Sequence, residues 1–234
     1  MEAFQTFERA MLDGAGLNRH AVFDLDALPA AVAASVRASC PDIERYRQLI
    51  LIGHGGRRMW QALQESGIDS DDPIDDFTLA TVRAWFSQCL PQQRFEILYP
   101  GPAAIGLQTL GSLAGWHHPT PLRIGIDHQW GTWFAYRALV LADTSFEASQ
   151  PEAGGAACDS CAGKVCIAHC PAGALAGGQF DFGTCAAYRK QADSLCQSTC
   201  LARVACPVGS QHRYCDAQIA HSYARSLQAI KRFY

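Results

Sequence analysis

The sequence lacks several features that would place the protein in a familiar class. No apolar run approaches the ~20 residues that a membrane-spanning helix needs, and the N-terminal stretch lacks the basic-then-apolar order of a signal peptide. No G-x-G-x-x-G occurs, and Gly53-His54-Gly55-Gly56 is not followed by the Lys and Ser/Thr of a phosphate-binding loop. These absences predict a cytoplasmic protein that spans no membrane and has no dinucleotide-binding fold.

The chain also lacks a large excess of charge of either sign. Its formal net charge is −3 over 234 residues, which gives no electrostatic reason to expect nucleic acid or an anionic membrane as a partner. Hydrophobic residues make up 49% of the sequence and charged residues 18%. We therefore expect the chain to bury a core rather than to remain disordered.

Cysteine, by contrast, is abundant and unevenly placed. Of the 11 cysteines, Cys40 and Cys89 lie alone, and the others crowd between Cys158 and Cys215. In a reducing cytosol, metal binding accounts for such a cluster better than a disulfide framework does. The small, polar, Gly-rich segment 147–157 has the composition of a linker. The sequence therefore predicts two domains, residues 1–150 and 151–234.

Hydrophobic patterning indicates strands and helices in alternation before the cysteines begin. Such an order predicts an α/β or α+β first domain. In the second domain, Ile219, Tyr223, Leu227 and Ile230 recur at helical spacing and predict a closing helix. The remaining expected elements are strands at 48–53, 95–99, 122–126 and 132–142, and a helix at 78–90.

The spacing of the cysteines repeats in two halves. The first half reads Cys158-x2-Cys161-x4-Cys166-x3-Cys170-Pro171, and the second reads Cys185-x10-Cys196-x3-Cys200-x5-Cys206-Pro207. A [4Fe–4S] cube needs four soft thiolates, and in two-cluster ferredoxins the Cys before each proline ligates the other cluster. We therefore expect two [4Fe–4S] clusters. One would be held by Cys158, Cys161, Cys166 and Cys206, and the other by Cys170, Cys185, Cys196 and Cys200.

Structural zinc and disulfides are the competing roles for these cysteines. Zinc sites use Cys/His quartets with short paired spacings, and Cys158-x2-Cys161 alone would fit one. Two Cys-Pro endings and a complete set of eight fit zinc poorly. Both halves are more widely spaced than usual, which leaves the division of the cysteines between the clusters more open than their total. Cys215, Cys40 and Cys89 are expected to be packed thiols.

The Cys-Pro arrangement, with the isolated cysteine of Cys185-Ala186-Ala187-Tyr188, resembles the C-terminal part of epoxyqueuosine reductases, which are cobalamin- and iron–sulfur-dependent enzymes. Upstream, the segments 111–116 (GSLAGW) and 131–134 (GTWF) resemble further motifs of that family. The segment 72–143 is also similar to cblC-type cobalamin-processing proteins, through the stretches 72–75, 95–98 and 131–137. Together these resemblances cover most of residues 45–215.

The resemblance implies an α+β fold in which a nitroreductase-like, cobalamin-binding domain precedes a ferredoxin-like domain with two [4Fe–4S] clusters. It implies base-off cobalamin contacted by Gly115, Trp116, Gly131, Trp133 and Phe134. The implied function is an iron–sulfur oxidoreductase that reduces the cobalt of a corrinoid, in cobalamin processing or in cobalamin-dependent reduction of an organic substrate. A flavodoxin- or ferredoxin-type protein would donate the electrons.

The sequence departs from the reductases at one position of chemical importance. Their catalytic aspartate precedes Thr-Gly-Pro, whereas here Tyr99 precedes Pro100-Gly101-Pro102. Tyr99 is therefore the candidate proton donor, although a phenol of pKa ~10 gives up a proton less readily than a carboxylic acid does. The departure argues against reduction of a queuosine precursor in tRNA. Two alternatives remain: a ferredoxin-type electron carrier without corrinoid, and a flavin-binding iron–sulfur reductase.

Overall fold

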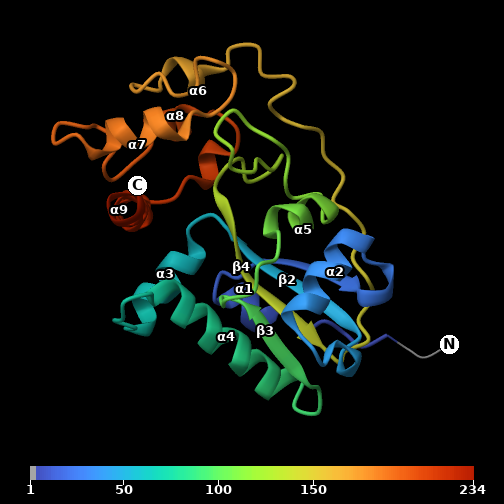
Figure 1. Ribbon diagram of the computed structural model, residues 1–234. Helices are drawn as coiled ribbons and strands as arrows, with labels where there is room; N and C mark the ends of the chain where they lie inside the picture. Colours follow the sequence, from blue (N-terminus) through green and yellow to red (C-terminus); the bar gives the residue numbers. More distant parts are fainter. Residues whose placement is uncertain (1–3) are drawn as a thin grey trace. The chain divides into compact units, whose positions relative to one another are not determined.

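The computed structural model describes residues 4–234, which form two compact units (Figure 1). The first unit contains the chain up to Gly115 together with Phe134–Glu152, and the second contains Trp116–Trp133 together with Ala153–Tyr234. The sequence predicts a division at residue 150. In the structure, the segment Trp116–Trp133, inside the predicted first domain, belongs to the second unit, where Trp133 packs against Tyr214 and Ile219.

The first unit is built on a four-stranded antiparallel sheet with the strand order β1-β2-β4-β3. Every residue of β2 is buried, as the continuous apolar run of this strand requires. The expected strands at 48–53, 95–99 and 132–142 are confirmed. The strands are β1 (Arg19–Asp24), β2 (Gln48–Gly55), β3 (Phe95–Tyr99) and β4 (Phe134–Ala142).

The expected strand at 122–126 is wrong. This segment is made of turns, with a single bridge between His118 and Ile126. Thr120 closes a local turn by donating its hydroxyl to the carbonyl of Ile124, at 2.7 Å. The alternation of apolar residues here therefore has no neighbouring strand to pair with among the described residues.

Helices α3 and α4 pack against strands β2 and β4 respectively. Pro73 occupies the first turn of α4, where its missing N–H costs no hydrogen bond. Trp85 and Phe86 of α4 are fully buried, so the expected helix at 78–90 is confirmed, although it begins earlier. The helices of this unit are α1 (Ala10–Gly14), α2 (Ala30–Ser39), α3 (Arg58–Ser66), α4 (Pro73–Cys89) and α5 (Leu107–Leu113), with 3-10 turns at Leu25–Ala27 and Ile43–Arg45.

The second unit consists of short helices and turns, closed by one long helix. Helix α6 packs against α8, and α7 packs against α9. Ile219, Leu227 and Ile230 are buried on α9, which confirms the expected closing helix. The elements are α6 (Val165–Ala168), α7 (Phe182–Lys190), α8 (Leu201–Ala205), a 3-10 turn (Ser210–His212) and α9 (Asp216–Phe233). Across the described residues, no helix combines the length and the apolar character needed to cross a membrane.

Candidate metal centre

Four cysteines of the second unit line one small cavity of about 20 Å³. Two of them lie on a turn, where the backbone N–H of Cys161 donates to the carbonyl of Cys158 at 3.4 Å. Cys166 lies on α6, and Cys206 follows the last residue of α8. We call Cys158, Cys161, Cys166 and Cys206 the first cysteine set.

Four further cysteines line a second, larger cavity of about 590 Å³ in the same unit. Cys170 follows α6, and Cys185 lies on α7. Cys196 is buried, and Cys200 immediately precedes α8. We call Cys170, Cys185, Cys196 and Cys200 the second cysteine set.

Helices α6 and α8 connect the two sets. Cys166 on α6 lines the first cavity, whereas Cys170, just beyond the helix, lines the second. Cys200, just before α8, lines the second cavity, whereas Cys206 at its other end lines the first. Cys170 and Cys206, which each precede a proline, therefore do not line the same cavity as the cysteines nearest to them in the sequence. The structure brings the eight cysteines together in the two groups expected from the sequence, and metal ligation by them stays a prediction.

Burial raises the pKa of five cavity thiols above the ordinary value, those of Cys158, Cys166, Cys185, Cys196 and Cys206. For Cys158, the neighbouring thiol of Cys206 raises the pKa further. For Cys185, burial and the charge of Cys200 raise the pKa to about 11, against an opposing effect of Arg189. These five thiols therefore hold their protons at neutral pH, and a metal must displace those protons to bind.

Tyr99, the candidate proton donor, ends strand β3 in the first unit. Burial raises the pKa of its hydroxyl, the charge of Asp75 raises it further, and Arg137 opposes both. A phenol in this environment stays protonated at neutral pH and can donate its hydrogen. The sequence shows neither neighbour, because Asp75 lies on α4 and Arg137 on β4.

Sequence reasoning missed a polar pair in the interior of the same unit. His54 is fully buried, and its Nδ1 accepts a hydrogen bond from Nε of Arg137 at 2.9 Å. His54 lies on β2, which continues as far as Gly55. An isolated histidine at the end of an apolar run was the available signal. It does not reveal the arginine on the neighbouring strand.

The glycines predicted to contact cobalamin have structural reasons to be glycine. Gly115 has a φ of +77° and Gly131 a φ of +60°, both in the left-handed region that disfavours other residues. A Cβ on Gly115 would overlap the backbone of Glu152, and a Cβ on Gly131 would overlap the carbonyl of Val208. Close backbone packing within each unit therefore accounts for both residues, and their contact with a cofactor stays a prediction.

The aromatic residues of the same prediction are buried. Trp116 and Trp133 are 1% and 0% exposed, and Phe134 is 8% exposed. Trp133 packs edge-on against Tyr214 at 5.4 Å in the core of the second unit. Phe134 begins β4, with the guanidinium of Arg19 5.4 Å from the centre of its ring. These rings are core side chains in this structure, and their role toward a corrinoid is untested.

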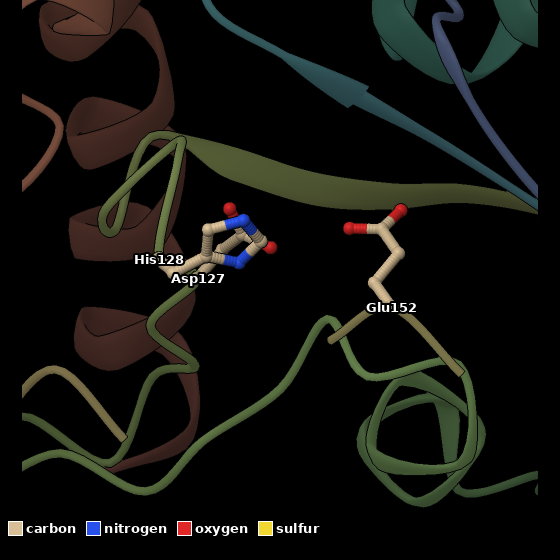
Figure 2. Close-up of side chains that lie close together, drawn as sticks. All are labelled: Asp127, His128 and Glu152. Carbon is tan, nitrogen blue, oxygen red and sulfur yellow. The ribbon is translucent and has the colours of Figure 1, made fainter. Parts of the chain in front are cut away.

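A tight turn precedes the segment 131–134. The carboxylate of Asp127 accepts hydrogen bonds from the backbone N–H groups of Gln129 and Trp130, both at 2.8 Å. Figure 2 shows Asp127 beside His128 on this turn. Glu152, also labelled in Figure 2, belongs to the first unit and accepts a hydrogen bond from Arg19 at 2.7 Å. The turn held by the Asp127 carboxylate accounts for the reversal of the chain just before Gly131.

The fold and the cysteine sets define the chain as an α+β protein with a cysteine-rich helical unit. No family model matches the sequence, and no curated protein matches it. The chain is similar to solved structures of epoxyqueuosine reductases. The enzyme from Streptococcus thermophilus superposes with a TM-score of 0.53 at 12% identity, over 86% of this chain and 65% of that one. The Bacillus subtilis enzyme gives 0.52 at 13% identity, over 89% of this chain and 67% of that one.

A third epoxyqueuosine reductase structure, solved with an epoxyqueuosine-modified tRNA stem loop, gives a TM-score of 0.52 at 12% identity, over 91% of this chain and 68% of that one. The chain thus spans about two thirds of the length of these proteins. At such low identity, the similarity establishes a shared fold.

Proposed function

We propose that the chain is an iron–sulfur oxidoreductase that holds one [4Fe–4S] cluster in each cysteine set and delivers electrons to a corrinoid. The first unit would be a nitroreductase-like corrinoid-binding domain and the second a ferredoxin-like module. The observation that carries the proposal is the division of eight cysteines between two cavities of one unit. The shared fold with epoxyqueuosine reductases supports it independently of the cysteine spacing.

The donor atoms fit iron–sulfur clusters better than single zinc ions. Both sets consist of cysteine sulfur alone, the soft donor that these clusters require. A tetrahedral zinc site with Zn–S bonds of about 2.3 Å places its sulfurs about 3.8 Å apart. Within the described part of the chain, no three cysteine sulfurs lie within 4.8 Å of one another. A cube holds its four thiolates at separate corners and does not need them this close.

Within this proposal, the clusters supply one-electron transfer and the protein supplies their positions and a proton. Each of the helices α6 and α8 carries or flanks two cysteines, one from each set. Because α6 packs against α8, these helices hold the two sets side by side in one unit. Tyr99 holds a proton on its phenol oxygen at neutral pH, and the rise in its pKa caused by burial makes it a weaker acid than a free phenol. We assign it the role of proton donor to the reduced substrate.

The corrinoid is the part of the proposal that rests on the fold alone. The indole rings of Trp116 and Trp133 are buried in packing and present no open face to a macrocycle. These two rings are therefore not available to contact a macrocycle.

A spectroscopic experiment tests the proposal and separates it from its alternatives. Protein purified without oxygen is mixed with cob(II)alamin, and absorbance and electron paramagnetic resonance spectra are recorded before and after reduction. We expect iron–sulfur signals together with a shift of the corrinoid to its base-off spectrum. Cluster signals without corrinoid binding would favour a plain electron carrier, and flavin released on heating would favour a flavin reductase. Absence of cluster signals would contradict the proposal.

Reduction of epoxyqueuosine in tRNA is a second candidate, favoured by the fold neighbour solved with a modified tRNA stem loop. The phenol of Tyr99 in place of a carboxylic acid weighs against it. Incubation of the reduced protein with such a stem loop, followed by mass spectrometry, distinguishes the two. Loss of one oxygen atom from the modified base, with uptake of two electrons and two protons and release of water, would establish this activity.

A further inference from the structure

Arg189 places a buried positive charge beside the second cysteine set. It lies on α7, is 6% exposed, and lines the same cavity as the four cysteines. Its guanidinium donates to the carbonyl of Cys196 at 2.9 Å, the carbonyl of Tyr223 at 2.8 Å and the hydroxyl of Ser226 at 3.0 Å. A longer bond of 3.5 Å reaches the carbonyl of Gln197. All of these acceptors are neutral.

Arg203, which is half-buried, adds a second positive charge to the lining of this cavity, and the exposed Arg123 adds a third. Arg203 lies on α8, with its guanidinium 4.5 Å from the ring centre of Trp133 and 5.3 Å from that of Tyr214. It donates to the carbonyl and the hydroxyl of Thr132. These neighbours, like those of Arg189, are neutral hydrogen-bond acceptors and aromatic rings.

A buried cation surrounded by neutral groups is costly unless an anion offsets its charge. The described residues that line the second cavity include no Asp or Glu. The four cysteines there become anionic once they lose their protons to a metal. A thiolate-bound cluster would therefore supply the negative charge that balances Arg189 and Arg203.

The first cavity lacks this arrangement. Among the described residues, the one basic side chain in its lining is that of Lys164, which is exposed. Solvent and salt screen an exposed ammonium group far more than a buried guanidinium. The two cysteine sets thus differ in the positive charge that a cluster in each would experience.

We propose that Arg189 and Arg203 raise the reduction potential of the cluster held by the second cysteine set above that of the cluster held by the first. The proposal rests on the proposed function, since it concerns clusters in both sets. Reduction adds one electron, taken from a low-potential donor such as dithionite, and forms no bond and takes up no proton. The added negative charge is stabilised by nearby guanidinium groups, so the electron of a half-reduced protein resides at the second set.

The ordering is tested first without changing either arginine. Cys206→Ser removes a ligand of the first set and Cys170→Ser a ligand of the second, so each variant is expected to retain one cluster. Potentiometric titration of each, followed by electron paramagnetic resonance, gives the potential of the retained cluster. We expect the Cys206→Ser protein to reduce at the higher potential. Equal potentials, or the opposite order, would overturn the inference.

The origin of the difference is then tested in the full chain with Arg203→Gln, Arg203→Lys and the matched control Lys164→Gln. We expect Arg203→Gln to lower the higher potential and to leave the lower one in place. Arg203→Lys should restore most of the shift, and Lys164→Gln should leave the higher potential unchanged. Iron content at the wild-type level with no shift in Arg203→Gln would overturn the inference while the proposed function stood. Absence of iron from the wild-type protein would overturn both.

Discussion

The two units of the chain are stabilised by different means. Most buried apolar side chains of the described residues belong to the first unit, where they form the sheet and the helices that cover it. The second unit has a smaller core around Trp133 and Tyr214 and contains both cysteine sets. Charge differs as well: the first unit has ten Lys and Arg against seventeen Asp and Glu, and the second has nine against five. We therefore expect apolar burial to be sufficient to fold the first unit and the second unit to depend on what its cysteines bind.

Removal of the metal should produce the largest difference in folding between the two units. When iron is stripped by a chelator, we expect the second unit to lose its fixed structure, because ligand binding supplies much of its folding free energy. The first unit should remain folded. Hydrogen exchange of backbone amides measures this, with α9 losing protection and β2 keeping it. Equal protection of α9 with and without iron would contradict the account.

Loss of a single cysteine ligand should have a smaller effect, which is confined to the cluster of one set. Cys206→Ser and Cys170→Ser should each reduce the iron content by about half, because each removes a thiolate from a different four-sulfur set. Cys89→Ser, outside both sets, is the matched control and should leave iron at the wild-type level. Iron analysis of the anaerobically purified variants is the measurement. Full iron content in either ligand variant would show that the assignment of that cysteine is wrong.

A core substitution in the first unit should destabilise that unit alone. Leu51 on β2 is fully buried, so Leu51→Ala should cost about 2–5 kcal/mol of unfolding free energy through lost burial and the cavity left behind. Gln64→Ala, at an exposed position of α3, should change stability by less than about 0.5 kcal/mol. Denaturant unfolding followed by far-UV circular dichroism tests both. Iron content should not change, and a loss of iron in Leu51→Ala would argue against the separate stabilisation of the units.

The smallest effect on stability is expected from the ionisation of Tyr99 in the first unit. Its pKa is raised in the folded protein, mainly by burial, so its phenolate should form only above the ordinary value of ~10. Because the unfolded chain ionises first, the stability contributed by this tyrosine is present below that value and is lost as the pH rises through the folded pKa. Difference absorbance titration of wild type against Tyr99→Phe measures the midpoint. A midpoint at or below the ordinary value would contradict the burial of this phenol as the main influence on its pKa.

The parts of the structure that the sequence predicts are those specified by local pattern. The apolar run of β2 and the periodic apolar residues of α9 define their elements without reference to the rest of the chain. The grouping of the eight cysteines follows from the Cys-Pro positions, because a short helix between two cysteines directs them to opposite sides. The parts that were missed depend on distant contacts. The alternation of Leu122, Ile124 and Ile126 is that of a strand, but the described part of the chain offers it no neighbouring strand.

The same limitation applies to the candidate site. The carbonyl of Val208 opposite Gly131 gives the structural reason for a glycine that the sequence motif assigned to cofactor binding. The bond between His54 and Arg137 joins two strands that are far apart in the chain. Arg189 is, in the sequence, an ordinary basic residue near the end of a helix, and its burial is evident only once α7 and α9 are packed. Sequence spacing locates thiols, but the charges that surround them are set by tertiary packing.

The most direct test of the central claim is the metal and acid-labile sulfide content of protein prepared without oxygen. Two four-iron clusters predict about eight iron atoms and eight sulfide ions per chain, with zinc absent. About two zinc ions per chain without sulfide, or no metal bound by the cysteine sets, would contradict the account.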